Sequence, residues 1–240
     1  MSIIVKKFGG TSLGDVSRLK NVAQRVLEHN NNDGSLVIVV SAMGSLTDTL
    51  VAEYQKVSLH SGAEFDAVAS AGEQISAGLL AQELQNLGVK ARSWLGWQLP
   101  ILTDDNYGSA KIKHMETKLI LEDIKAGVVP IITGFQGVDD NNRITTLGRG
   151  GSDLTAVAMA VALGADKCDI YTDVPGVYEK DPKENGSAKK LDALTYNEML
   201  TFVRDGANVM ELRAVELAQQ NNLKVEVLSS FENVSGTIIS

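Results

Sequence analysis

Short apolar runs alternate with stretches of helical period along most of this chain. Runs that predict strands lie at residues 3–8, 36–41, 128–133, 167–172, 224–229 and 237–239. Stretches with the apolar spacing of amphipathic helices lie at residues 16–28, 46–57, 153–163, 196–204 and 209–221. This alternation is typical of βαβ units and predicts an α/β fold with a mainly parallel sheet covered by helices.

Two segments interrupt the alternation. Residues 134–146 place a polar tip at residues 139–142 between two short strand-like runs, which predicts a β-hairpin projecting from the sheet. Residues 181–190 form a charged stretch with glycine and proline that suits a lid or the rim of a site. Because the sequence contains no repeat or low-complexity linker, we expect a single domain over residues 1–240, with a helical subdomain near residues 44–90 as an alternative.

Composition indicates a globular protein of the cytoplasm. Hydrophobic residues make up 44% of the 240 positions, enough for a substantial core, and the longest apolar stretches are far shorter than the roughly 20 residues of a membrane helix. We therefore expect neither a membrane span nor a signal peptide. The single cysteine, Cys168, excludes an intramolecular disulfide framework, and its apolar neighbours predict a buried thiol.

Charge and motif content exclude several classes of function. The formal charge of −8 repels polyanions, and no basic run interleaved with aromatic residues offers a groove for nucleic acid. The three histidines are scattered, which gives little support to a zinc site or a Ser-His-Asp triad. The sequence also lacks the signatures of a dinucleotide-binding site and of a protein kinase.

The first glycine-rich motif, residues 7–12 (KFGGTS), stands between a predicted strand and a predicted helix. Gly9 and Gly10 allow backbone N–H groups to approach phosphate oxygens, and Lys7 can neutralise charge on a transferring phosphoryl group. The motif is not a Walker loop, because Asp15 stands where the lysine would be. An ordinary glycine turn is the alternative interpretation.

The second glycine-rich motif, residues 147–153 (LGRGGSD), follows the predicted hairpin and opens a predicted helix. Its three glycines allow a ligand to approach the backbone closely, and Arg149 offers a guanidinium fork to a carboxylate or phosphate. Asp153 can orient a lysine or a metal. The alternative is that Ser152 or Asp153 merely caps the helix and that Arg149 is a surface charge.

Further candidates lie at other strand ends. Residues 171–178 (YTDVPGVY), which continue to residues 181–183, offer an aromatic ring, backbone groups and charge where open α/β sheets bind ligands, with a simple Pro-Gly turn as the alternative. Ser41 and Glu73, in two shorter segments, can reach the same rim. Glycine-rich strand ends that carry lysine, arginine and aspartate favour phosphoryl transfer, in which positioning and charge neutralisation do most of the catalytic work.

Six segments, taken in order, resemble the motifs of aspartokinases over nearly the whole chain. They are residues 7–12 (KFGGTS), 41–44 (SAMG), 70–73 (SAGE), 134–137 (GFQG), 146–153 (TLGRGGSD) and 172–178 (TDVPGVY). The resemblance implies a three-layer α/β/α sandwich in which ATP and L-aspartate meet over the carboxyl ends of the strands. It further implies Mg²⁺-assisted phosphorylation of the β-carboxylate of aspartate, the first step toward lysine, threonine and methionine.

The resemblance also implies a role for each matching residue. Lys7 would stabilise the transferring phosphoryl group, and Asp153 would organise that lysine and the phosphates. Arg149 would hold the α-carboxylate of aspartate, and Glu73 its α-ammonium group. The other implied contacts with aspartate are Ser41, Thr47, Phe135, Gly150 and Ser152. The other implied contacts with the nucleotide are Gly9, Gly10, Thr172, Asp173, Tyr178, Asp181 and Lys183, and no metal ligand is assigned.

Two departures from the aspartokinase pattern carry expectations of their own. Aspartokinases usually have lysine where Asn208 stands, so we expect weaker nucleotide binding or slower turnover. They also continue past the position of Ser240 into paired ACT modules that bind effectors, so we expect a catalytic domain without that regulatory region. The rival functions are a related kinase with another acceptor and a binding module with impaired catalysis. The oligomeric state stays open, with a homodimer as one option.

Overall fold

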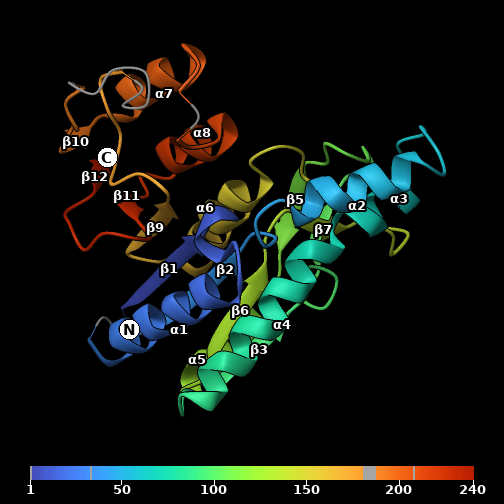
Figure 1. The fold of residues 1–240 in the computed structure, drawn as a ribbon, viewed down its shortest axis with the longest axis horizontal. Coiled ribbons are helices and arrows are strands. Elements are labelled where there is room, and N and C mark those ends of the chain that lie inside the picture. Colours follow the sequence, from blue (N-terminus) through green and yellow to red (C-terminus); the bar gives the residue numbers. More distant parts are fainter. Residues whose placement is uncertain (1, 33, 181–187, 208) are drawn as a thin grey trace.

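The computed structural model describes residues 2–32, 34–180, 188–207 and 209–240. Among them, one large sheet contains the strands β1 (Ile3–Phe8), β2 (Ser35–Val40), β3 (Ala91–Trp94), β6 (Val129–Thr133), β9 (Lys167–Thr172), β10 (Ala193–Leu194), β11 (Val225–Ser229) and β12 (Thr237–Ile239). Their order across the sheet is β10-β12-β11-β9-β1-β2-β6-β3 (Figure 1). Every neighbouring pair is parallel except β11 with β12, so the prediction of a mainly parallel sheet is confirmed.

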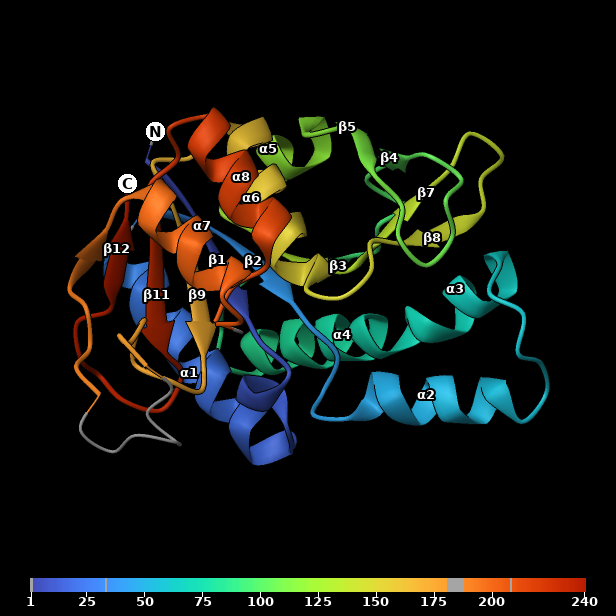
Figure 2. The ribbon, with the colours of Figure 1, turned by 90° about the horizontal axis from the view of Figure 1, so that it is seen from above.

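Helices cover both faces of the large sheet (Figure 2). On one face lie α1 (Val16–Asn32) and α4 (Ala71–Asn86), and on the other lie α5 (Lys118–Lys125), α6 (Gly151–Leu163), α7 (Tyr196–Arg204) and α8 (Leu212–Gln220). Strand β2 shows why both faces need a cover: Val37 and Val39 face one core, whereas Leu36, Ile38 and Val40 face the other. The implied three-layer α/β/α sandwich is therefore confirmed.

A second, smaller sheet stands beside the large one, in the order β5-β4-β7-β8. Its strands are β4 (Ile101–Thr103), β5 (Ile112–Met115), β7 (Gln136–Val138) and β8 (Ile144–Thr146). The predicted hairpin is formed by β7 and β8, which pair antiparallel. It lies outside the large sheet, and it does not stand alone, because β7 also pairs with β4. Strands this short carry too little periodicity to be recognised in the sequence.

Three helices occupy the segment where a helical subdomain was considered: α2 (Leu46–Gln55), α3 (Ala63–Ala69) and α4. Helix α2 lies along the outside of the molecule and has no buried residue (Figure 2). Helix α8 begins at Leu212 rather than at residue 209, because Glu211 caps it by accepting the Ala214 N–H at 2.9 Å. Cys168 is fully buried, as predicted, and none of the described helices has the length and apolar character to cross a membrane.

Candidate active site

Three loops meet where β1, β2 and β9 end. The Gly9 N–H donates to the carbonyl oxygen of Tyr171 at 3.1 Å, which joins the first glycine-rich motif to the end of β9. The Gly44 N–H donates to the carbonyl oxygen of Gly10 at 2.9 Å, which joins the same motif to the loop after β2. Carboxyl ends of neighbouring parallel strands are where open α/β sheets bind ligands, so this edge is the candidate site.

Lys7 and Asp153 form an ion pair at the centre of this edge. The Lys7 Nζ lies 2.7 Å from Asp153 Oδ1, and the two side chains are only 12% and 10% exposed. Lys7 comes from β1, whereas Asp153 lies in the first turn of α6, where the helix dipole adds positive potential. A cation, a helix start and adjacent glycine-rich backbone therefore converge at one place, which suits phosphate oxygens.

The start of α6 is fastened to the start of α8. The Glu211 N–H donates to Asp153 Oδ2 at 3.3 Å. Gly150 precedes α6 with φ of 68°, and its Cα stands against the Glu211 side chain, so that an added Cβ would lie 2.5 Å from Glu211 Cβ. Only glycine combines this backbone conformation with this closeness. Asp153 is thus held by Lys7 on one oxygen and by α8 on the other.

Glu73 is a buried carboxylate with an unused oxygen. It lies in the first turn of α4, is 4% exposed, and accepts the Ala42 N–H on Oε1 at 3.1 Å. Its Oε2 atom is buried and has no hydrogen-bond partner among the described residues. Burial raises the pKa of Glu73 to about 7, although the backbone hydrogen bonds act in the opposite direction. A buried carboxylate with an unpaired oxygen is suited to bind a cationic group of a ligand.

Ser41 and Thr47 lie close to Glu73 and the end of β1. The Ser41 N–H donates to the Phe8 carbonyl oxygen at 3.1 Å, which places Ser41 directly beside the first glycine-rich motif. Gly72 lets the loop after β2 approach α4, because a Cβ there would lie 2.7 Å from Ala42 Cβ. The same Cβ would lie 3.5 Å from Oγ1 of Thr47, which stands in the first turn of α2. Ser41, which was expected at the same rim as Glu73, and Thr47, which the resemblance implied as a contact of aspartate, therefore both lie near the end of β1 or the start of α4.

Phe135 occupies a strained position between β6 and β7. Its φ is 69°, a left-handed conformation that bulky residues rarely adopt. The Phe135 N–H donates to Thr155 Oγ1 at 3.1 Å, and its carbonyl oxygen accepts the Leu147 N–H at 2.8 Å. Beside it, a Cβ on Gly134 would lie 2.6 Å from Ser152 Oγ. These contacts hold the Gly134–Phe135 segment against Leu147 and against the first turns of α6, where Ser152 and Thr155 lie.

Arg149 stands at the tip of that turn. It is exposed and has no hydrogen-bond or ion-pair partner within the part of the chain that the structure describes. The flanking residues Gly148 and Gly150 have φ angles of 80° and 68°, so both favour glycine. The turn therefore presents an uncommitted guanidinium group next to α6.

The residues assigned to the nucleotide are only partly placed together. Thr172 ends β9, the strand that pairs with β1, and Asp173 follows it. The Ser230 N–H donates to the Thr172 carbonyl oxygen at 2.9 Å. Tyr178 is half-buried and bridges to Lys190. Three other positions lie outside the described residues: Asp181, Lys183 and Asn208.

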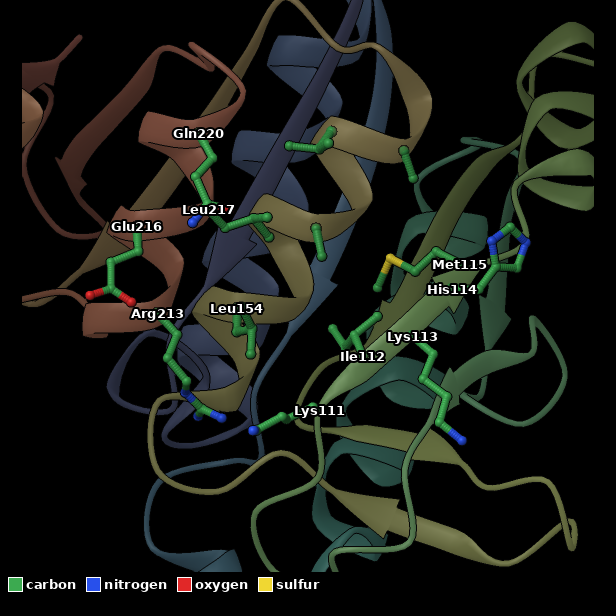
Figure 3. A pocket seen from close by; sticks show the side chains of 13 residues that line it. Lys111, Ile112, Lys113, His114, Met115, Leu154, Arg213, Glu216, Leu217 and Gln220 are labelled. Carbon is green, nitrogen blue, oxygen red and sulfur yellow. The ribbon is translucent and has the colours of Figure 1, made fainter.

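A cavity of about 500 Å³ opens away from these residues, between β5, α6 and α8 (Figure 3). Lys111 and Arg213 point toward one another at one end, and Ile112, Leu154 and Leu217 line the space above them. None of the residues assigned to aspartate or ATP lines it. Arg213 is engaged elsewhere as well, because its Nη2 donates to the Leu147 carbonyl oxygen at 2.6 Å.

Comparison with known proteins identifies the family. The model of the amino acid kinase family matches residues 2–229. The chain belongs to the amino acid kinase family. The aspartokinase of Bacillus sp. (strain MGA3) is 48% identical over 240 residues, which are 100% of this chain and 58% of that relative. The chain thus spans less than two thirds of the length of this curated relative.

Two solved aspartate kinases share the fold of this amino acid kinase chain. The enzyme from Synechocystis is 40% identical with a TM-score of 0.90, and the match covers 99% of this chain and 39% of that one. Aspartokinase III of E. coli, solved in complex with aspartate and ADP, is 28% identical with a TM-score of 0.90 over 99% of this chain and 64% of its own.

Two carboxylates that shape this amino acid kinase site escaped the sequence analysis. Glu211 supports Asp153 and Gly150 as described above, and in the sequence it is only one polar position within the helical stretch predicted at residues 209–221. Asp66 is 0% exposed and accepts the N–H and the hydroxyl of Thr146. A single acid on the apolar side of a short helix, next to Phe65 and Ala69, was the available signal for Asp66.

Proposed function

We propose that this chain carries an ATP-dependent aspartate kinase, which transfers a phosphoryl group to the β-carboxylate of L-aspartate. The observation that carries the proposal is the Lys7–Asp153 ion pair at 2.7 Å. It lies near Glu73, a buried carboxylate of which only one oxygen has a hydrogen-bond partner. The relatives support it, since the compared proteins are aspartokinases and one of them was solved with aspartate and ADP.

Glu73 and Arg149 provide complementary charges for an α-amino acid. Glu73 Oε2 is a buried acceptor suited to the α-ammonium group, and the uncommitted Arg149 guanidinium suits the α-carboxylate. With both groups of the amino acid engaged, the side-chain carboxylate is left to face the phosphoryl donor. A uridylate acceptor has no ammonium group and would leave Glu73 unsatisfied, which disfavours the related nucleotide kinases.

Lys7 acts on the charge that moves during transfer. The acceptor carboxylate of aspartate is ionised at neutral pH, so no general base is required. The barrier lies in bringing two anions together, and the Lys7 ammonium group, oriented by Asp153, reduces that repulsion where charge develops. The N–H groups at the start of α6 and in the glycine-rich motif add positive potential without a side chain.

The donor is expected to enter as Mg-ATP. Within the described residues, no cluster of three or more histidine, cysteine, aspartate or glutamate side chains could hold a metal on its own. This fits Mg²⁺, which kinases usually hold through the phosphates and only one or two carboxylates. Asp153, 10% exposed and beside Lys7, is a carboxylate suited to that supporting role. The ion would neutralise charge on the phosphates.

The proposal is tested by measuring ADP release from Mg-ATP with L-aspartate, N-acetylglutamate, glutamate and uridylate as alternative acceptors. We expect turnover that depends on L-aspartate and exceeds that with the other three. If ADP is released faster with another acceptor, that acceptor replaces aspartate as the proposed substrate. Nucleotide binding without turnover on any acceptor would instead favour a binding module with impaired catalysis.

A further inference from the structure

Asp66 is a fully buried carboxylate that connects α3 to the end of β8 and to the loop of Gly108. Its Oδ2 accepts the Thr146 N–H at 2.6 Å and the Gly108 N–H at 3.0 Å. Its Oδ1 faces the Thr146 hydroxyl at 2.9 Å. Both oxygens are therefore engaged, and the three donors come from segments 42 and 80 residues away in the chain.

The end of β8 and the loop of Gly108 support the turn that carries Arg149. Thr146 ends β8, three residues before Arg149. The Ala110 N–H donates to the Thr146 carbonyl oxygen at 2.8 Å, which fastens the loop of Gly108 to the end of β8. The same loop touches the turn itself, because a Cβ on Gly148 would lie 3.2 Å from the Gly108 carbonyl oxygen. By holding both Thr146 and Gly108, Asp66 fixes the point from which the turn begins.

On its own side, Asp66 belongs to the element that carries Glu73. Helices α3 and α4 are separated only by Ser70, which itself has right-handed helical φ and ψ angles. Glu73 follows in the first turn of α4. A further contact fastens this junction to β7, since Gln136 Nε2 donates to the Ser70 carbonyl oxygen at 3.0 Å. Asp66 is therefore the link between the Glu73 helix and the Arg149 turn.

Core stability alone is a weak reason for a carboxylate here. Burial raises the pKa of Asp66 in spite of its three hydrogen bonds, which shows that desolvation outweighs them. Buried charged groups of this kind are often no more stabilising than apolar residues of similar volume. A carboxylate, unlike an apolar side chain, can accept hydrogen bonds from three donors at once.

We propose that Asp66 is a positioning residue for the acceptor amino acid: through Thr146 and Gly108 it sets the separation between Glu73 and Arg149. The inference rests on the proposed function of those two residues. Asp66 touches neither substrate in this account. Its loss is expected to weaken aspartate binding while leaving the Lys7–Asp153 ion pair, and hence the chemical step at saturating aspartate, largely intact.

The test compares Asp66→Ala, Asp66→Asn and the unaltered chain by steady-state kinetics and by calorimetric titration with aspartate. Asp66→Ala should raise the KM and Kd for aspartate about tenfold or more, with the KM for ATP and kcat changed less than about threefold. Asp66→Asn should restore most of the affinity. Its amide oxygen can accept both N–H groups, and its NH₂ can donate to the Thr146 hydroxyl after that hydroxyl reverses.

Asp123→Ala is the matched control. Asp123 is also buried, and it accepts hydrogen bonds from Arg92 and Trp94 of β3, the edge strand of the large sheet. This variant should lose stability without changing the KM for aspartate. If Asp66→Ala fails to fold, Thr146→Val, which removes only the hydroxyl contact, should still raise the KM for aspartate about threefold.

Each outcome decides between the two claims. The positioning role is overturned if Asp66→Ala changes the KM for aspartate no more than Asp123→Ala does. It is also overturned if Asp66→Ala raises the KM for ATP as much as the KM for aspartate. If the unaltered chain binds aspartate but does not turn over, the proposed reaction is overturned. The positioning role of Asp66 is then judged from the Kd for aspartate of Asp66→Ala relative to that of the unaltered chain. Absence of any aspartate binding by the unaltered chain overturns both.

Discussion

At the scale of single residues, Glu73 shows how burial prepares a binding group. Its pKa is raised from 4.5 to about 7, so below about pH 7 the free protein holds a proton there that the unfolded chain releases near pH 4.5. The stability that this proton contributes is therefore fully present below pH 4.5 and is lost as the pH rises through about 7. An ammonium ligand reverses the preference, because it stabilises the charged carboxylate.

Proton release on aspartate binding follows from this shift. At about pH 6, binding should release most of one proton from Glu73, and at about pH 8.5 almost none, since the group is then already ionised. Calorimetry in buffers of different ionisation enthalpy measures the release. Glu73→Gln should bind aspartate weakly and should not release this proton. Equal release at both pH values, or release that persists in Glu73→Gln, would show that Glu73 does not meet the ammonium group.

Lys7→Ala should lower kcat by at least about a hundredfold, because its contact is chiefly with charge that develops in the transition state. Aspartate binding, measured by titration, should change by less than about threefold.

The neighbouring lysine provides the control for Lys7. Lys6 is 2% exposed, and its Nζ lies 3.3 Å from Asp169. Successive strand residues point to opposite faces, so Lys6→Ala removes a buried lysine from the face of β1 that does not meet Asp153. It should reduce the melting temperature but keep kcat. An unchanged kcat in Lys7→Ala would remove Lys7 from the mechanism.

At the scale of elements, helix α6 connects the core to the site. It is buried along most of its length, from Gly151 to Ala160, which anchors its first turn firmly under the sheet edge. Left-handed glycines stand at both of its ends: Gly150 with φ of 68° and Gly164 with φ of 61°. An added Cβ on Gly150 would meet the Glu211 side chain, whereas an added Cβ on Gly164 would meet nothing within 4 Å.

This asymmetry predicts different results for the same substitution. Gly164→Ala should cost about 1–2 kcal/mol of folding free energy, the cost of a left-handed alanine, and leave activity unchanged. Gly150→Ala should cost more, because its Cβ also displaces Glu211, and it should lower kcat through the contact from Glu211 to Asp153. Urea unfolding and initial rates measure both. Equal effects at the two glycines would contradict the coupling of α6 to α8.

How well the sequence predicted each element depended on its length and burial. The strands at residues 3–8 and 167–172 have the predicted bounds, because turn-forming residues follow each of them: Gly9 and Gly10 follow the first, and residues 173–176 (DVPG) follow the second. Strands β4, β5, β7 and β8 have only three or four residues, and of these only the hairpin pair was recognised, through its polar turn. Their assembly into a second sheet depends on tertiary pairing that no local pattern contains.

At the scale of the whole molecule, the site is made by elements far apart in the sequence. Lys7 and Asp153 were proposed from glycine-rich motifs that carry a charge, whereas the role of Glu73 was implied by the resemblance to aspartokinases. The contacts that hold them were not predicted: Asp66 meets Thr146 across 80 residues, and Glu211 meets Asp153 across 58. Acids such as Asp66 and Glu211 resemble ordinary surface acids in the sequence, and only the fold brings them to their partners.

The identity of the phosphorylated product tests the central claim most directly. The chain is incubated with Mg-ATP, L-aspartate and hydroxylamine, which traps an acyl phosphate as a hydroxamate, and the trapped compound is assigned by NMR spectroscopy. The account predicts aspartate β-hydroxamate, formed in proportion to the ADP released and abolished in Lys7→Ala. An α-hydroxamate, or aspartate-dependent ADP release with no hydroxamate, would contradict it.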